Sequence, residues 1–202
     1  MAARRSAGSG RRIGAAIGTG VRCHHPDCPT LWLITDERLG DGLWTALDRL
    51  PRGGGVIFRH YSLPTGERRI LFAQIARVAR RRGLILARAG TTPMRGEQGV
   101  HGRSLKQGRG LRTWPAHNLR EVIAGRRARA DAILISPVFP TRSHAAQRPL
   151  GVMQAARLAQ AARGKAVALG GMNPSSFRRL GAAGFIGWAA IDGWLGNGPT
   201  RR

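Results

Sequence analysis

The chain has few residues of several kinds, and each shortage excludes a class of protein. Its 202 residues include only two cysteines, so a disulfide framework is not indicated. No apolar run approaches the ~20 residues that a transmembrane helix needs. The first 25 residues are basic but lack the continuous apolar segment of a secretory signal. We therefore expect a cytoplasmic protein with no membrane span.

Acidic residues and lysines are also scarce. Ten acidic residues stand against 34 basic ones, which gives a formal net charge of +24 and a pI near 12.0. Such a charge favours contact with phosphates. However, only Lys106 and Lys165 are lysines, the arginines are spread along the whole chain, and there is a single tyrosine. The pattern indicates an arginine-rich composition rather than an interleaved basic and aromatic surface, so nucleic-acid binding is not expected as the main role.

From Leu31 onward, apolar runs of strand length alternate with segments of helical period. The predicted strands are residues 31–35, 55–59, 84–87, 100–101, 111–114, 132–135, 166–169 and 184–188. The predicted helices are residues 42–50, 67–82, 117–129, 150–162 and 174–180. In the second helix the apolar face is predicted to carry Ile70, Leu71, Gln74, Ile75 and Val78, with arginines opposite.

About eight strands alternating with helices predict parallel pairing through crossover helices. The fold class that follows is α/β, a TIM (β/α)8 barrel. Between Ala87 and Leu111 there is room for loops but hardly for two helices, so the barrel is expected to be shortened around its third and fourth βα units.

A chain of this size and 42% hydrophobic content is expected to form one domain. We place it at residues 30–196, between a basic tail over residues 1–29, which is predicted to be disordered, and a C-terminal tail over residues 197–202. The N-terminal tail contains Cys23 and Cys28 with two histidines between them. No second pair follows, so a solvated segment is favoured over a zinc site, and no metal ligand is predicted.

Two predicted strands end in loops suited to a ligand. Residues 130–141, ADAILISPVFPT, run from an apolar strand into a turn that exposes Thr141. Residues 165–169 lead into Gly170 and Gly171, after which Asn173 and Pro174 open a helix. Glycines let backbone N–H groups approach a phosphate closely, although a tight turn without any ligand also explains them.

These motifs, in this order, resemble those of the thiamine phosphate synthase and thiazole tautomerase superfamily. The resemblance covers residues 31–195 and rests on LWLITDER, GVIFR, GVH, AH, ADAILISPVFPT, ALGGMN and AAGFIGWAAI. It implies a TIM barrel that works in thiamine biosynthesis. The implied reaction couples a thiazole phosphate to a pyrimidine pyrophosphate, with magnesium assisting the departure of pyrophosphate.

The resemblance also implies a set of substrate-binding residues. A phosphate would be held by backbone amides of one loop and of the end of the last strand. Pyrophosphate would be contacted by an arginine after the second strand and by hydroxyl groups after the sixth. The matching positions here are Gly170, Gly171, Trp188, Ala189, Arg59, Thr141 and Ser143.

Several positions depart from the family pattern. Tyr61 and His144 stand where the family has lysines that grip pyrophosphate. Arg88 stands where the family has a magnesium-binding carboxylate, and no acid occurs between His101 and Arg120. No cofactor is therefore certain, and magnesium is expected only if the synthase reaction is retained.

His117 matches the histidine that the tautomerase branch links to proton transfer without a metal, although Pro115 takes the place of a serine. The alternative is that His117 merely begins its helix, and His101 is a second candidate acid or base. Three functions stay open at this point: a synthase, a metal-free tautomerase, and a non-catalytic barrel that binds a phosphorylated ligand. The expected partners are small phosphorylated substrates, and assembly into a homo-oligomer is left open.

Overall fold

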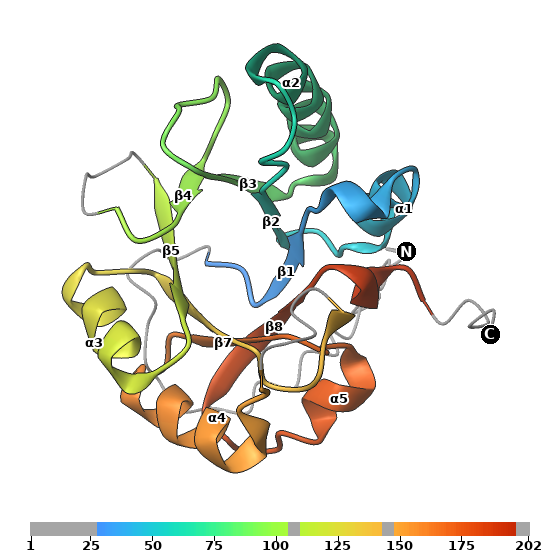
Figure 1. Ribbon diagram of the computed structural model, residues 1–202. Coiled ribbons are helices and arrows are strands. Elements are labelled where there is room, and N and C mark those ends of the chain that lie inside the picture. The colour runs from blue at the N-terminus through green and yellow to red at the C-terminus, as the bar shows by residue number, and fades with distance from the viewer. Residues whose placement is uncertain (1–27, 105–109, 143–147, 197–202) are drawn as a thin grey trace, which may run out of the picture.

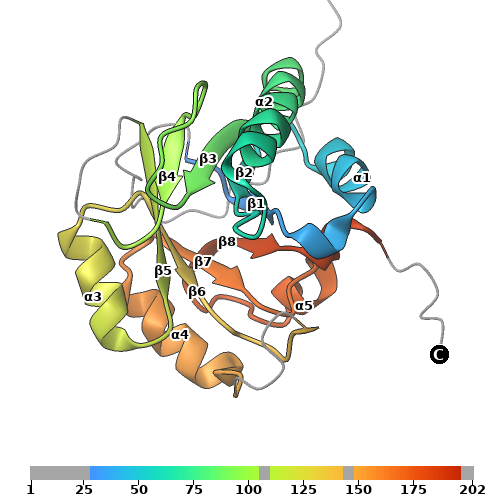
Figure 2. The same cartoon turned by 45° about the horizontal axis from the view of Figure 1, so that its top comes forward.

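Eight parallel strands close into a barrel in the order β1 to β8, and β8 pairs with β1 (Figures 1 and 2). The computed structural model describes residues 28–104, 110–142 and 148–196. The strands are β1 Leu31–Ile34, β2 Gly55–Phe58, β3 Ile85–Ala89, β4 Gly99–His101, β5 Leu111–Ala116, β6 Ala132–Ile135, β7 Ala166–Leu169 and β8 Phe185–Ala190. The predicted TIM barrel is thereby confirmed.

Helices follow some strands and not others. They are α1 Gly42–Arg49 after β1, α2 Thr65–Arg82 after β2, α3 Leu119–Arg127 after β5, α4 Gly151–Ala161 after β6 and α5 Pro174–Arg178 after β7. Two short 3-10 segments, η1 Glu37–Leu39 and η3 Asp192–Trp194, follow β1 and β8. Within the described residues, no helix lies between β3 and β5, and Figure 1 shows loops beside β4. The predicted shortening at the third and fourth units is therefore confirmed.

The buried face of α2 differs from the one predicted. Its buried residues are Arg68, Phe72, Ile75 and Ala79, while Ile70 is 62% exposed. The predicted apolar face of α2 was wrong because the prediction assigned Ile70 and Gln74 to the buried face and every arginine to the exposed face. Arg68 is buried because its guanidinium reaches backbone carbonyls at the top of the barrel rather than a carboxylate.

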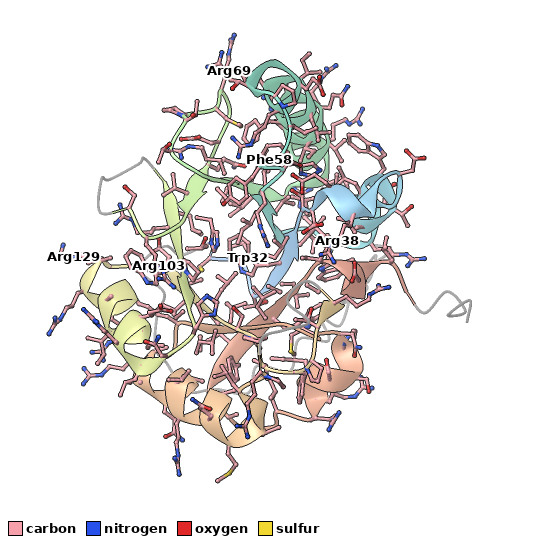
Figure 3. All side chains as sticks on the ribbon, viewed as in Figure 1. Trp32, Arg38, Phe58, Arg69, Arg103 and Arg129 are labelled. Carbon is pink, nitrogen blue, oxygen red and sulfur yellow. The ribbon has the colours of Figure 1, made fainter. Side chains whose placement is uncertain are left out.

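Alternate residues of each strand face the barrel interior and the helices. Trp32 lies inside the ring of strands, and a Cβ on Gly55 would lie 2.2 Å from its ring (Figure 3). Phe58 faces outward, because it meets Phe72 of α2 edge to face, with ring centroids 5.3 Å apart. This alternation decides which side chains reach the mouth of the barrel.

The described helices include none with the length and apolar character of a membrane span. Several predictions fall outside the described residues. They are the tail over residues 1–27 with Cys23, the C-terminal tail over residues 197–202, and the candidate residues Ser143 and His144.

Candidate functional site

The carboxyl ends of the strands form the mouth of the barrel, which is where TIM-barrel enzymes carry their active sites. Ala89, His101 and Thr113 are register partners across β3, β4 and β5. Arg59 follows the outward-facing Phe58, so its side chain begins on the interior side. Its charge acts on both His101 and Asp36, which places these three groups around one opening.

His101 is neutral at physiological pH. Burial lowers its pKa to about 4, and the nearby charge of Arg59 adds to that shift. Its Nδ1 lies 2.8 Å from Thr113 Oγ1, which fixes the ring. A neutral, hydrogen-bonded imidazole here can accept or donate a hydrogen bond, but it adds no positive charge for a pyrophosphate.

Asp36 is a carboxylate at the mouth that the sequence reasoning did not select. It follows β1, and its side chain is 13% exposed. Burial opposes its ionisation, but hydrogen bonds from Arg38 and the charges of Arg38 and Arg59 outweigh that effect and lower its pKa. Arg38 Nε lies 2.6 Å from Asp36 Oδ1, so this anion is already paired. The LWLITDER motif contained the residue, but its spacing did not show that it faces Arg59.

Arg88, which stands where the family has a metal ligand, points away from the mouth. It is the register partner of the outward-facing Phe58. Its Nε lies 2.5 Å from Glu97 Oε2, and its Nη1 donates to the carbonyl of Gly90. The Arg88 side chain therefore lies on the outer layer of the barrel and does not enter the mouth.

The donors at the mouth nevertheless do not fit a magnesium ion held by carboxylates. Asp36 is paired with Arg38, and Asp192 lies 3.1 Å from Arg142. Among the described residues, no three histidine, cysteine or acidic side chains come together as a metal-binding group. Magnesium prefers several oxygen ligands in octahedral geometry. The described residues of the mouth therefore do not supply the set of oxygen ligands that a magnesium ion would need.

His117 lies directly after β5 and is half-buried, outside helix α3. The N-cap of α3 is Asn118, whose side chain accepts from Glu121 N, so His117 does not cap the helix. Its backbone N–H donates to Glu121 Oε2 at 2.7 Å. Its Nδ1 lies 2.7 Å from the carbonyl oxygen of Ser136.

That contact assigns the tautomer of His117. A carbonyl oxygen only accepts, so Nδ1 must carry the proton and donate it to Ser136 O. In the neutral ring, Nε2 is then the atom with the free lone pair. This is the arrangement that a general base requires, with one ring nitrogen anchored and the other left to act.

Gly170 and Gly171 connect β7 to α5 with positive φ angles of 95° and 61°. A Cβ on Gly170 would lie 2.8 Å from Pro137 Cα, and one on Gly171 would lie 2.6 Å from Pro140 O. Both glycines are therefore needed for the loop after β7 to pack against the loop after β6. This packing explains them without a ligand, and it also brings their backbone beside Thr141, the residue after Pro140.

The loop after β8 joins the same group. A Cβ on Gly193 would lie 2.3 Å from Met172 O, so η3 rests against the loop after β7. Arg142, which follows Thr141, reaches Asp192 of η3. The loops after β6, β7 and β8 thus form one side of the mouth. Thr141, Gly170 and Gly171 lie in the first two of these loops, and Trp188 and Ala189 lie in β8 itself.

Trp188 and Ala189 lie near the end of β8 and face opposite ways. Ala189 is the register partner of Trp32 and so faces the interior. The Trp188 ring faces the outer layer, stacked on Trp194 with centroids 4.6 Å apart. Only the backbone of Trp188 is therefore placed to reach a ligand, as the sequence reasoning assumed.

Arg59 stands on the opposite side of the barrel with Tyr61. Its guanidinium carbon lies 5.9 Å from the Tyr61 ring centroid, and Tyr61 is 57% exposed. Beneath them Arg68 donates to the carbonyls of Arg59, His60 and Ala89, at 3.1, 3.0 and 2.7 Å. Arg68 thus anchors the backbone that carries Arg59. An arginine within a helix of many arginines gave no sequence signal for this role.

The model of the family described as thiamine monophosphate synthase matches residues 103–193. No curated protein matches the chain.

Solved structures show the same barrel. A thiamine phosphate pyrophosphorylase from Pyrococcus furiosus has a TM-score of 0.71 at 20% identity, covering 83% of this chain and 87% of that one. A thiamine phosphate pyrophosphorylase from Bacteroides thetaiotaomicron has a TM-score of 0.55 at 17% identity, covering 82% and 84%. A structure titled native KDPGal has a TM-score of 0.52 at 12% identity, covering 85% and 84%.

At these identities the structural likeness establishes the fold alone. The family match lies on the half of the barrel that carries His117, Gly170 and Gly171. The chain is therefore similar to the thiamine monophosphate synthase family over residues 103–193, and it shares the barrel fold of two thiamine phosphate pyrophosphorylases.

Proposed function

We propose that the protein binds a thiazole phosphate at the mouth of the barrel, with its phosphate against the loops after β6, β7 and β8. Gly170 and Gly171 bring main-chain groups close to the surface of this side without side chains in the way. Thr141 adds a hydroxyl group. Arg142 adds a cation that is 82% exposed and only partly satisfied by Asp192.

The observation that carries a catalytic role is the hydrogen bond from His117 Nδ1 to Ser136 O. It leaves Nε2 as the proton acceptor at the end of β5, the strand next to β6. We propose that His117 moves a proton on the bound thiazole, as in a metal-free isomerisation. This reaction needs no magnesium, which agrees with the poor fit of the donors to that ion.

A second candidate is the coupling of the thiazole phosphate to a pyrimidine pyrophosphate. Arg59 favours it, because its guanidinium is at the mouth and makes no hydrogen bond or ion pair with another described residue. Tyr61 in place of a lysine and the neutral His101 argue against a strong grip on pyrophosphate. The synthase reaction therefore remains the alternative.

The first experiment is calorimetric titration with a thiazole phosphate and with the same thiazole lacking the phosphate. Varying the ligand avoids disturbing Gly171, where even a Cβ would meet Pro140 O at 2.6 Å. Charge-assisted hydrogen bonds of about 1.5–3 kcal/mol predict that the phosphate improves binding by at least about tenfold. Equal binding of the two compounds would remove the phosphate site from the proposal.

The chemistry is tested with His117→Asn. The asparagine amide retains a donor near the position of Nδ1 for Ser136 O but has no Nε2, so binding should persist while isomerisation is lost. Turnover should also be indifferent to a chelator. Product from thiazole phosphate and pyrimidine pyrophosphate that requires magnesium would instead establish the synthase, and binding without any turnover would establish a ligand-binding barrel.

A further inference from the structure

We propose that the amino-terminal end of the barrel carries a second ligand site, for a small anion with an apolar body. A cavity of about 860 Å³ lies there, at the starts of β1 to β4 and beneath the end of α2. This is the end opposite the mouth, so the cavity is separate from the site described above. It is lined by Cys28, Pro29, Thr30, Arg52, Gly53, Ala76, Arg80, Gly83, Leu84, Ile85, Leu86, Gly96, Glu97 and Gln98.

The cavity exists where the barrel lacks a helix. Residues 90–98 return from the end of β3 to the start of β4 without forming one. The loop lies against α2 at one point, since a Cβ on Gly96 would lie 3.9 Å from Ala76 Cβ. The volume of the cavity falls within the ~300–1,000 Å³ that is usual for small-molecule sites.

Two arginines give the cavity its chemistry. Arg52 and Arg80 both lie near the carboxyl end of α2. Their side chains make no hydrogen bond or ion pair with another described residue. Arg52 bends over Gly83, because a Cβ there would lie 3.1 Å from its guanidinium carbon. Guanidinium groups bind carboxylates, sulfonates and phosphates through paired hydrogen bonds.

The one carboxylate of the cavity does not oppose an anion. Glu97 Oε2 lies 2.5 Å from Arg88 Nε and accepts from Met94 N at 2.9 Å, so its charge is already neutralised. The remaining wall combines apolar side chains, among them Pro29, Ala76 and Ile85, with the polar Thr30 and Gln98. Leu84 and Leu86 are 2% and 1% exposed. The two arginines with this wall match an amphipathic anion rather than a free inorganic ion.

The test uses 1-anilinonaphthalene-8-sulfonate and N-phenyl-1-naphthylamine, which share an aromatic body but differ in the sulfonate. Fluorescence titration of the full chain gives both dissociation constants. We expect Arg80→Gln and Arg52→Gln each to weaken sulfonate binding by about tenfold and to leave the neutral compound unchanged. Arg69→Gln, near the start of the same helix, is the matched control and should change neither (Figure 3).

Two results with the arginine variants and the parent chain would overturn the proposal. One is sulfonate binding that is equal in Arg80→Gln, Arg69→Gln and the parent chain. The other is displacement of the sulfonate by a thiazole phosphate, which would place the probe at the mouth. Ala76→Trp, which fills the cavity from α2, should abolish binding of both compounds, and unchanged binding in that variant would also contradict the assignment. Near-UV circular dichroism of each variant excludes loss of fold as the cause.

Discussion

Replacement of Glu97 by glutamine tests how the helix-free side of the barrel is held. Glu97 pairs with Arg88 at 2.5 Å, and their side chains are only 18% and 10% exposed. The substitution preserves the shape of residue 97 and removes its charge, so the Arg88 guanidinium keeps only neutral partners such as the carbonyl of Gly90.

Removing one partner of a fully buried pair costs about 3–5 kcal/mol. Here both side chains retain some exposure and Arg88 keeps one hydrogen bond, so we expect a loss of about 2–3 kcal/mol in the free energy of unfolding. For a chain of this size, about 2–4 °C in Tm corresponds to each kcal/mol, which gives a fall of about 4–12 °C. Urea unfolding with an unchanged m-value would measure the loss.

Asp48→Asn is the matched control. Asp48 also pairs with an arginine, at 3.3 Å from Arg82 Nη1, but its side chain is 70% exposed. Exposed pairs contribute about 0–1 kcal/mol, so this variant should remain close to the parent. The double variant Arg88→Met with Glu97→Gln should recover part of the stability, because no unpaired charge is left. Equal losses for Glu97→Gln and Asp48→Asn would refute the reasoning.

Three further predictions concern single residues. Because the pKa of His101 is about 4 in the folded chain and about 6.5 when unfolded, stability should fall as pH drops from 6.5 to 4, with a smaller fall in His101→Asn, measured by denaturant titration at each pH. Arg163 has a positive φ of 51°, so Arg163→Gly should raise the free energy of unfolding by about 0.5–1 kcal/mol. Nitrogen NMR should show the neutral His117 ring protonated on Nδ1, and the opposite tautomer would contradict its hydrogen bond to Ser136.

The periodicity of the sequence predicted the barrel because its signals are local. The runs at residues 132–135 and 166–169 are β6 and β7 with the same bounds. The shortening of the barrel around its third and fourth βα units could be predicted from the length of the segment between Ala87 and Leu111. The direction in which each strand side chain faces could not be predicted from the sequence, because strand registers are set by contacts between distant segments. Arg88 therefore matched a family position in sequence while its side chain points outward, and Ile70 was wrongly placed on the core face of α2.

The candidate site was predictable to a similar extent. Motifs located the loops with Thr141, Gly170 and Gly171, since glycine and proline patterns mark close approach. The motifs did not reveal that the charge of Arg59 acts on Asp36, or that His117 donates a hydrogen bond to Ser136. In each pair the two residues follow different strands, so only the folded structure brings them together. The roles of these residues toward a ligand stay predictions.

The stacked pair of Trp188 and Trp194 gives the protein a built-in optical reporter. Two indoles with centroids 4.6 Å apart and planes inclined by 14° couple their electronic transitions, and the coupling depends steeply on separation and angle. Trp188 belongs to β8 and precedes Ala189, which faces the interior of the barrel. Trp194 belongs to η3, which rests on the loop after β7. Any movement of that loop should therefore change the circular dichroism of the pair, so occupancy of the mouth becomes readable without a label.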